Sequence, residues 1–350
     1  MKELLLMIPG PTFVHPRVLR TLSKPMTPHR AKEFSQMFLE QAERLKKVFR
    51  TKNEMIILSG SGTSGMDAAL SSLVKPSDEV LCVVSGKFSE RFKEIALANG
   101  AEVEELSFEW GSEIDVLKVK EALEIKDFKA LCVVHNESST GVKNPVSEIG
   151  RLTKKTNTVL IADTISSMGG DDIRVDSWGI DICVSGSQKC FALPPGLAFL
   201  SVSEKAFERM EGSNYYLDLR KYKIHKHKAP FTQSISMIYA LEEGLNLIFE
   251  EGLSNRIKRH KRLAKLTREG IENLGFKLFP KRKSICSETV TAFKTNDAED
   301  IARKLKERFG IAIAGGQEHL KGKILRIGHM GNCQERHVFS TLSCLKKVLK

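Results

Sequence analysis

The chain has 350 residues, of which 41% are hydrophobic, and a formal net charge of +12 at pH 7. This length and composition suit one large domain or two unequal ones with a sizeable core, which excludes a disordered, fibrous or miniature disulfide-stapled protein. No apolar run approaches the roughly 18 residues that span a bilayer, and the short apolar start lacks a signal-peptide cleavage site, so we expect a cytoplasmic protein without membrane association.

From residue 55 onward, short apolar strands alternate with segments of helical pattern. Small or amphipathic helical patterns at 63–74 and 89–99 follow the first two of these strands. The expected strands are 55–58, 79–84, 130–135, 159–163, 180–185 and 197–202. Continuous runs rich in β-branched residues, separated by helices, predict a mostly parallel sheet that is covered on both faces.

After about residue 230 the pattern changes to long, charged, helix-compatible stretches. Helices are expected at 234–251, 253–274 and 298–309, with apolar segments at 276–279 and 289–293, a strand at 324–327 and a terminal helix. We therefore predict an α/β protein in three parts. These are an N-terminal arm over 1–20, a large domain over 21–250, and a smaller C-terminal α+β domain over 251–350.

The positive charge raises the question of a nucleic-acid partner. The basic run at 256–262 continues into Leu263, Ala264 and Leu266, which fits the solvated face of a helix better than a binding arm. We expect no nucleic-acid partner. A positive surface can equally attract small anions such as carboxylates and phosphates.

The seven cysteines form no CxxC pair, and Cys82, Cys132 and Cys183 lie in apolar runs, which is typical of reduced cysteines buried in a core. Neither His225 nor His227 has a cluster of further ligands nearby in the sequence, so no metal site is expected.

The first candidate site is the Ser-Gly-Ser-Gly-Thr-Ser-Gly segment at 59–65, between an expected strand and an expected helix. Glycines let backbone amides turn inward, and a helix N-terminus has a partial positive charge, so a phosphate fits there. The segment lacks the GxGxxG spacing of a dinucleotide site and the lysine of a nucleotide-binding loop. An ordinary strand-to-helix turn stays open as its interpretation.

Two further candidates follow expected strands. Asp163 ends the strand at 159–163, at the sheet edge where α/β proteins bind ligands, although a turn or helix cap is also possible. Lys189 follows the strand at 180–185 between small residues. A desolvated amine there would have a depressed pKa and could form a Schiff base, whereas an exposed loop lysine would have no such role.

Together, the three candidates describe a pocket for pyridoxal 5'-phosphate. A phosphate-binding turn, an aspartate, and a lysine 26 positions after it would all lie at carboxyl ends of strands. The aspartate would keep the pyridine nitrogen protonated, so that the ring acts as an electron sink, and the lysine would bind the aldehyde.

The chain resembles the class V, fold type I aminotransferases, especially the alanine/serine–glyoxylate (pyruvate) group. The resemblance covers nearly the whole chain. The matching motifs are PGP at 9–11, SGSG at 59–62, HNESSTG at 135–141, AD at 162–163, SGSQK at 185–189, PPG at 194–196 and RIG at 326–328.

The resemblance implies that the large domain binds pyridoxal phosphate and that particular residues hold it. Asp163 would bind the pyridine nitrogen and Lys189 would form the Schiff base, as the two catalytic residues. The other cofactor-binding residues would be Ser61, Gly62 and Thr63 at the phosphate, Gln188 beside them, Phe88 stacked on the ring, Ser138 near the ring oxygen, and Thr232 reaching the phosphate in the neighbouring subunit.

The resemblance also implies the substrate contacts and the assembly. Arg326 would bind the substrate α-carboxylate as a bidentate pair, with Gly10 also on the substrate side. The Thr232 match and the apolar N-terminal segment indicate a homodimer with shared active sites. Many glyoxylate-using relatives have Trp where this chain has Phe88, and some have His in place of Thr63, which bears on substrate preference more than on cofactor binding.

The function implied is a ping-pong transfer of the amino group of alanine or serine to glyoxylate or pyruvate. An aspartate or aminoethylphosphonate aminotransferase stays open as an alternative, and a cysteine desulfurase-like lyase is a further one. Desulfurases typically have His at the positions of Gln188 and Phe88, and their catalytic cysteine would have to be Cys286 or Cys333. A non-catalytic binding protein with this fold would have no need of the matching lysine, aspartate and arginine.

Overall fold

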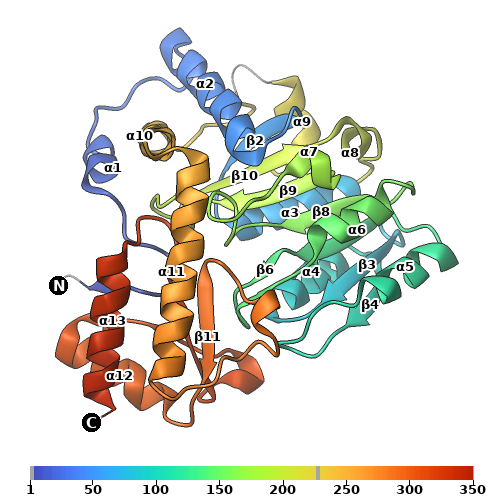
Figure 1. Ribbon diagram of the computed structural model, residues 1–350. Coiled ribbons are helices and arrows are strands. Elements are labelled where there is room, and N and C mark those ends of the chain that lie inside the picture. The colour runs from blue at the N-terminus through green and yellow to red at the C-terminus, as the bar shows by residue number, and fades with distance from the viewer. Residues whose placement is uncertain (1–3, 226–228, 350) are drawn as a thin grey trace.

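The computed structural model describes residues 4–225 and 229–349, and His227 therefore lies outside the described residues. Within those ranges the largest sheet has seven strands in the order β2-β10-β9-β8-β5-β3-β4 (Figure 1). Their bounds are β2 (Glu54–Ser59), β3 (Glu79–Val84), β4 (Glu102–Ser107), β5 (Ala130–Val134), β8 (Val159–Asp163), β9 (Ile182–Gly186) and β10 (Leu197–Val202). β10 runs antiparallel to both of its neighbours, and the other pairs are parallel.

Side chains of the central strands alternate between two hydrophobic cores. Leu160 and Ala162 of β8 belong to the core on one face, and Val159 and Ile161 to the core on the other. The helices that contribute to the first core include α2 (Lys32–Phe49), α5 (Val116–Ile125), α6 (Val146–Thr153), α7 (Val175–Trp178) and α10 (Ile235–Glu251). Those of the second core are α3 (Gly62–Leu73), α4 (Lys87–Ala98), α8 (Glu204–Glu208) and α9 (Leu219–Ile224). Both faces of the sheet are therefore covered, as in other α/β proteins.

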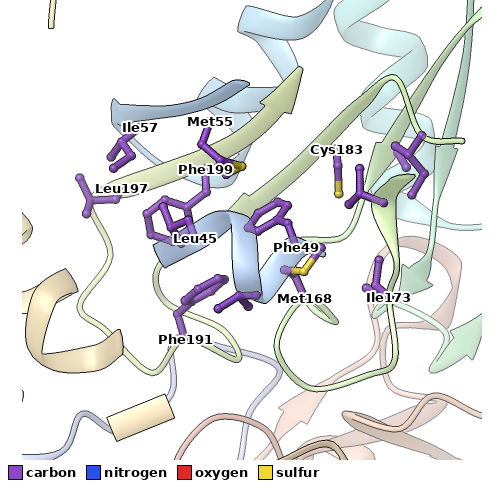
Figure 2. Packing of buried hydrophobic residues seen from close by; sticks show 14 of the residues in the cluster. Leu45, Phe49, Met55, Ile57, Met168, Ile173, Cys183, Phe191, Leu197 and Phe199 are labelled. Carbon is purple, nitrogen blue, oxygen red and sulfur yellow. The ribbon is translucent and has the colours of Figure 1, made fainter. Parts of the chain in front are cut away.

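Figure 2 shows part of the first core, where an aromatic cluster anchors the loop that follows β9. Phe191 lies two residues after Lys189 and is 2% exposed. Its ring centroid lies 4.8 Å from that of Phe199 on β10 and 6.5 Å from that of Phe49 on α2. Packing of this kind restricts the loop that holds Lys189.

The C-terminal part builds a second, antiparallel sheet from β11 (Val290–Lys294), β14 (Ile324–Gly328) and β13 (Ala314–Gly315). The helices of this part are α11 (Leu253–Asn273), α12 (Ala298–Phe309) and α13 (Glu335–Val348). β1 (Leu5–Leu6) near the N-terminus pairs with β12 (Ile311–Ala312), so the N-terminal segment joins this part of the molecule. The division into 1–20, 21–250 and 251–350 stays a prediction. The remaining short elements are α1 (Pro16–Thr21), β6 (Asn136–Glu137), β7 (Val142–Lys143) and two 3-10 turns, Lys283–Ile285 and Glu318–Leu320.

The basic run at 256–262 is not simply a solvated helix face, and that expectation is wrong for two of its residues. Arg256 is 2% exposed, and its guanidinium donates to the Cys190 carbonyl (2.6 Å) and to Glu251 (2.8 Å). His260 is fully buried, and its Nε2 accepts from the backbone N–H of Gly331 (3.1 Å). α11 packs against the loop after Lys189 and against the C-terminal part, so these two side chains have buried partners.

All seven cysteines lie in the described part of the chain and are free, and Cys82, Cys132 and Cys183 are buried as expected. None of the helices within the described ranges is long and apolar enough to cross a membrane.

Candidate active site

A cavity of about 90 Å³ lies where the carboxyl ends of β8 and β9 meet the N-terminus of α3. Seven residues expected at the cofactor line it, namely Gly62, Thr63, Phe88, Ser138, Asp163, Gln188 and Lys189. The lining also includes Arg91, Asn136, Ile165 and Ser166, which the sequence analysis did not single out. The sheet therefore brings together groups from five separate stretches of sequence, as parallel sheets do at their carboxyl edge.

Lys189 extends into this cavity from the loop after β9. Its amine donates a hydrogen bond to the carbonyl oxygen of Pro9, and its own carbonyl oxygen accepts one from the Thr12 hydroxyl (3.3 Å). Burial lowers the pKa of Lys189 to about 8, against the opposing effect of the Asp163 carboxylate. A buried amine with a depressed pKa spends more time in the neutral, nucleophilic form.

Asp163, the last residue of β8, is 4% exposed. One carboxylate oxygen accepts from the backbone N–H of Ile165 at 2.7 Å. Burial raises the pKa of Asp163 to about 7, although the positive charges of Lys189 and Arg91 oppose the rise. A buried carboxylate with one backbone hydrogen bond has unused acceptor capacity and would be stabilised by a bound cationic group.

The expected phosphate-binding turn leads into α3, whose first residues are Gly62 and Thr63. A Cβ at position 62 would lie 2.5 Å from the Ile165 side chain, so only glycine fits without a shift. The Thr63 hydroxyl accepts from Arg91 at 3.3 Å. Within the described structure, the side-chain oxygen of Gln188 is buried without a hydrogen-bond partner. A buried polar atom of this kind indicates that a ligand completes the site.

Arg326 approaches the cavity from β14 in the C-terminal sheet. Its guanidinium is 7% exposed and donates to the carbonyl oxygens of Ser138 (2.9 Å) and Gly315 (2.9 Å). Burial lowers its pKa to about 10, while the nearby Glu137 opposes the change. Within residues 4–225 and 229–349 this guanidinium forms no ion pair with a carboxylate. A buried guanidinium bound only by neutral groups suits a carboxylate ligand.

Two residues expected to bind the cofactor and one expected to bind the substrate do not line this cavity. Ser61, the N-cap of α3, is exposed, and so is Thr232, which precedes α10. Both lie outside the lining of the cavity. Gly10 lies against Lys189, because a Cβ at this position, with φ at +99°, would lie 2.5 Å from the Cδ of that lysine.

Glu137 is a structural residue of the site that the sequence analysis passed over within the 135–141 motif. It is fully buried, and its carboxylate accepts from the backbone N–H groups of Phe88 (3.1 Å), Ser89 (3.0 Å) and Ser139 (3.1 Å). It thus stabilises the first turn of α4, from which Phe88 and Arg91 face the cavity. The spacing of three residues between those two was the available signal for Arg91, since i and i+3 share a helix face.

The cysteines that a desulfurase would need are buried. Cys286 is 5% exposed and Cys333 is 2% exposed, and burial raises the pKa of Cys333 to about 12. A buried thiol with a raised pKa is inert at neutral pH. Neither residue lines the cavity that contains Lys189.

Comparison with known proteins agrees with this arrangement. A model of the class V aminotransferase family matches residues 17–331. An uncharacterized aminotransferase of Methanocaldococcus jannaschii is 48% identical over 99% of this chain and 92% of its own length. A Synechococcus protein named as the small subunit of a soluble hydrogenase is 39% identical over 99% of this chain and 92% of its own length.

Solved structures agree over the whole chain. The ureidoglycine–glyoxylate aminotransferase of Bacillus subtilis has a TM-score of 0.96 at 33% identity, covering 100% of this chain and 93% of that one. The alanine–glyoxylate aminotransferase of a Nostoc species has a TM-score of 0.95 at 34% identity, covering 100% and 96%. The fold, the cavity and these similarities show that the chain belongs to the class V aminotransferase family and is a transaminase of the fold type I architecture.

Proposed function

We propose that this transaminase uses pyridoxal 5'-phosphate to move the amino group of a small L-amino acid, alanine or serine, to glyoxylate or pyruvate. The observation that supports this most directly is the placement of a buried lysine and a buried aspartate in one cavity. The guanidinium of Arg326 is not part of the lining, but it donates to the carbonyl oxygen of Ser138, which is.

The residues present fit this cofactor. Asp163 offers a buried carboxylate to a protonated ring nitrogen, and the N-terminus of α3 offers partial positive charge to a phosphate. The side-chain oxygen of Gln188 has no partner among the described residues, and turning the amide over would instead present its nitrogen, which can donate to a phosphate. When bound, pyridoxal phosphate would supply the electron sink that stabilises negative charge on the substrate carbon.

Side chains of the protein would bind the substrate, move the proton and exclude water. Arg326 would bind and orient the substrate carboxylate through its planar fork. The Lys189 amine, with a pKa near neutrality, is suited to hold and return the proton of the substrate α-carbon at its Nζ atom. Phe88 and Ile165 provide apolar surface that would exclude water from the cavity.

The substrate assignment rests on charge and on the relatives. Arg326 provides one guanidinium, which suffices for a substrate with one carboxylate. The two solved structures described above are named for glyoxylate as the acceptor, whereas their donors differ, ureidoglycine in one and alanine in the other. The acceptor is therefore the better supported half of the reaction. The Synechococcus relative bears a different name, but the lysine, aspartate and arginine described above suit amino-group transfer.

We also propose a cytoplasmic homodimer with shared active sites, in which Thr232 of one subunit reaches the cofactor phosphate of the other. Thr232 is exposed, as this role requires. Beside it in the chain, Phe231 packs against Tyr216 with ring centroids 4.8 Å apart, and Tyr215 and Tyr216 are 79% and 43% exposed. An exposed aromatic cluster of this kind is typical of a protein interface.

The experiment that tests the proposed function is a pair of half-reactions followed by absorption. Titrating the protein with pyridoxal phosphate should produce a visible band, alanine should bleach it, and glyoxylate should then restore it. A protein that develops no band with the cofactor, or whose band survives every amino acid offered, would contradict the proposal.

A further inference from the structure

We infer that Arg91 supplies the positive charge that binds the phosphate group of the cofactor. This inference rests on the proposed function, and it concerns a residue for which neither the motif match nor the expected set of phosphate contacts assigns a role.

The placement of Arg91 follows from α4. Arg91 lies three residues after Phe88, and its guanidinium carbon is 4.9 Å from the centroid of that ring, so the two side chains share one face of the helix. From there the guanidinium reaches across to α3 and donates to the Thr63 hydroxyl at 3.3 Å. The charge therefore stands at the N-terminal turn of α3, where the phosphate is expected.

The charge balance of the cavity points to the same role. A phosphate monoester has close to two negative charges at neutral pH, and the N-terminus of α3 offers only about half a positive charge. Among the described residues that line the cavity, the cations are Arg91 and Lys189. Because the lysine amine is expected to bond to the cofactor aldehyde, Arg91 is the lining cation left for the phosphate.

Other basic residues of α4 already have partners. Lys93 pairs with Glu105 at 2.7 Å, and Lys87 pairs with Glu318 at 3.1 Å. Arg91 forms no ion pair within residues 4–225 and 229–349, although acidic side chains are frequent on its own helix. It is half-buried, so an anion bound beside it would be less screened than at the open surface.

The competing role for Arg91 is to bind a second, distal carboxylate of a dicarboxylate donor. The contact with Thr63 favours the phosphate, because Thr63 belongs to the turn expected to bind it. The two roles make different predictions for cofactor affinity in the absence of any amino acid.

The test compares pyridoxal phosphate with pyridoxal, which has the aldehyde and ring but no phosphate. Both are titrated into the wild-type protein and into R91Q, R91K and K93Q, and dissociation constants are read from absorption and from quenching of intrinsic fluorescence. Removing one charge-assisted contact should weaken binding of pyridoxal phosphate by R91Q about ten- to a hundredfold. The dissociation constant for pyridoxal should change less than about twofold, because pyridoxal has no phosphate for Arg91 to bind.

The two other variants serve as controls on the same helix. K93Q removes an equal charge from α4 but breaks only the pair with Glu105, so its affinity for both compounds should match the wild type. R91K keeps the charge without the planar fork and should give an intermediate loss for pyridoxal phosphate alone. If R91Q fails to fold, as judged by circular dichroism, the selective loss in R91K answers the same question.

The outcomes separate this inference from the proposed function. If the wild-type protein does not bind pyridoxal phosphate, the proposed function fails. If the wild type binds it and R91Q binds it equally well, or if R91Q loses both compounds by the same factor, the phosphate role of Arg91 is overturned while the proposed function stands.

Discussion

The amine of Lys189 donates its hydrogen bond to the carbonyl oxygen of Pro9, 180 residues earlier in the chain. The same N-terminal segment is tied to the strand that contains Arg326, because the Met7 carbonyl accepts from the backbone N–H of Gly328 at 2.9 Å. One short segment thus joins the expected reactive amine to the sheet that holds the expected carboxylate-binding guanidinium. A substitution that moves this segment should therefore change the positions of both the Lys189 amine and the Arg326 guanidinium.

Within this segment, Gly10 lies directly against Lys189. In Gly10→Ala, the new Cβ would lie 2.5 Å from the Cδ of Lys189 and 2.8 Å from its amine, so the lysine must move. A displacement of this size is expected to lower kcat by about a hundredfold. Steady-state kinetics would detect the loss.

The matched control is Gly275→Ala, since Gly275 also has a positive φ (+88°) but would have nothing within 4 Å of its Cβ. Both variants should lose about 1–2 kcal/mol of stability through left-handed backbone strain, and only Gly10→Ala should lose catalytic rate. Equal rates in the two variants would show that contact with Lys189 is unimportant.

Lys189 is expected to bond covalently to the cofactor. Borohydride reduction of the loaded protein, followed by peptide mass spectrometry, should find the pyridoxyl group on Lys189. A group on any other lysine would overturn the assignment. Lys189→Ala should lose about 10²–10⁴ in kcat, because the positioned amine that moves the proton is gone.

Asp163→Asn should lower activity while it stabilises the cofactor-free protein. The change keeps the shape and the hydrogen bond from Ile165 but removes the charge that would pair with a protonated ring nitrogen. We expect kcat to fall by about a hundredfold or more, with a smaller loss of cofactor affinity. Unchanged turnover in this variant would show that the role of Asp163 is misassigned.

The stability gain of Asp163→Asn should depend on pH. The folded-state pKa of about 7 lies above the usual value of 3.8, so the folded protein binds this proton more tightly than the unfolded chain does. The contribution of Asp163 to stability therefore falls as pH rises from about 4 to about 7 and stays unfavourable above that range. Urea unfolding should give Asp163→Asn an advantage of about 4 kcal/mol at pH 8 and a clearly smaller one, about 2 kcal/mol, at pH 5.

The sequence predicts the central sheet well where strands are buried on both faces. β3, β8 and β10 occur at their expected residues, because a continuous apolar run bounded by helices has few other solutions. β4 was missed, since its Glu-Val-Glu-Glu-Leu-Ser sequence is half charged and lies at the edge of the sheet. The hydrophobic pattern also could not predict that β10 is antiparallel, because a strand buries the same side chains in either direction.

The sequence predicts those residues of the candidate site whose type is rare at their position in the fold. A lysine after a buried strand and an aspartate at the end of another were found because polar groups are costly in such places. Arg91 was missed because an arginine on a charged helix has many exposed alternatives, and only the approach of α4 to α3 brings it to Thr63. Likewise, the sequence around Arg256 is typical of an exposed helix face, and only the packing of α11 against the loop after Lys189 shows that Arg256 is buried.

The last prediction concerns the substrate carboxylate. Arg326→Lys keeps a positive charge but loses the planar fork, so binding of both donor and acceptor should weaken by about 1–3 kcal/mol. KM for alanine and KM for glyoxylate should therefore rise together, since the two substrates would occupy the same carboxylate site in alternate half-reactions. Arg303→Lys is the control, because Arg303 is exposed and pairs with Asp300 and Glu307 of its own helix, α12. The same variants can be used to compare donors. If aspartate or aminoethylphosphonate bleaches the visible band of the wild type while alanine and serine leave it unchanged, the small-donor assignment is wrong and a second anion-binding group must serve the distal end of the donor.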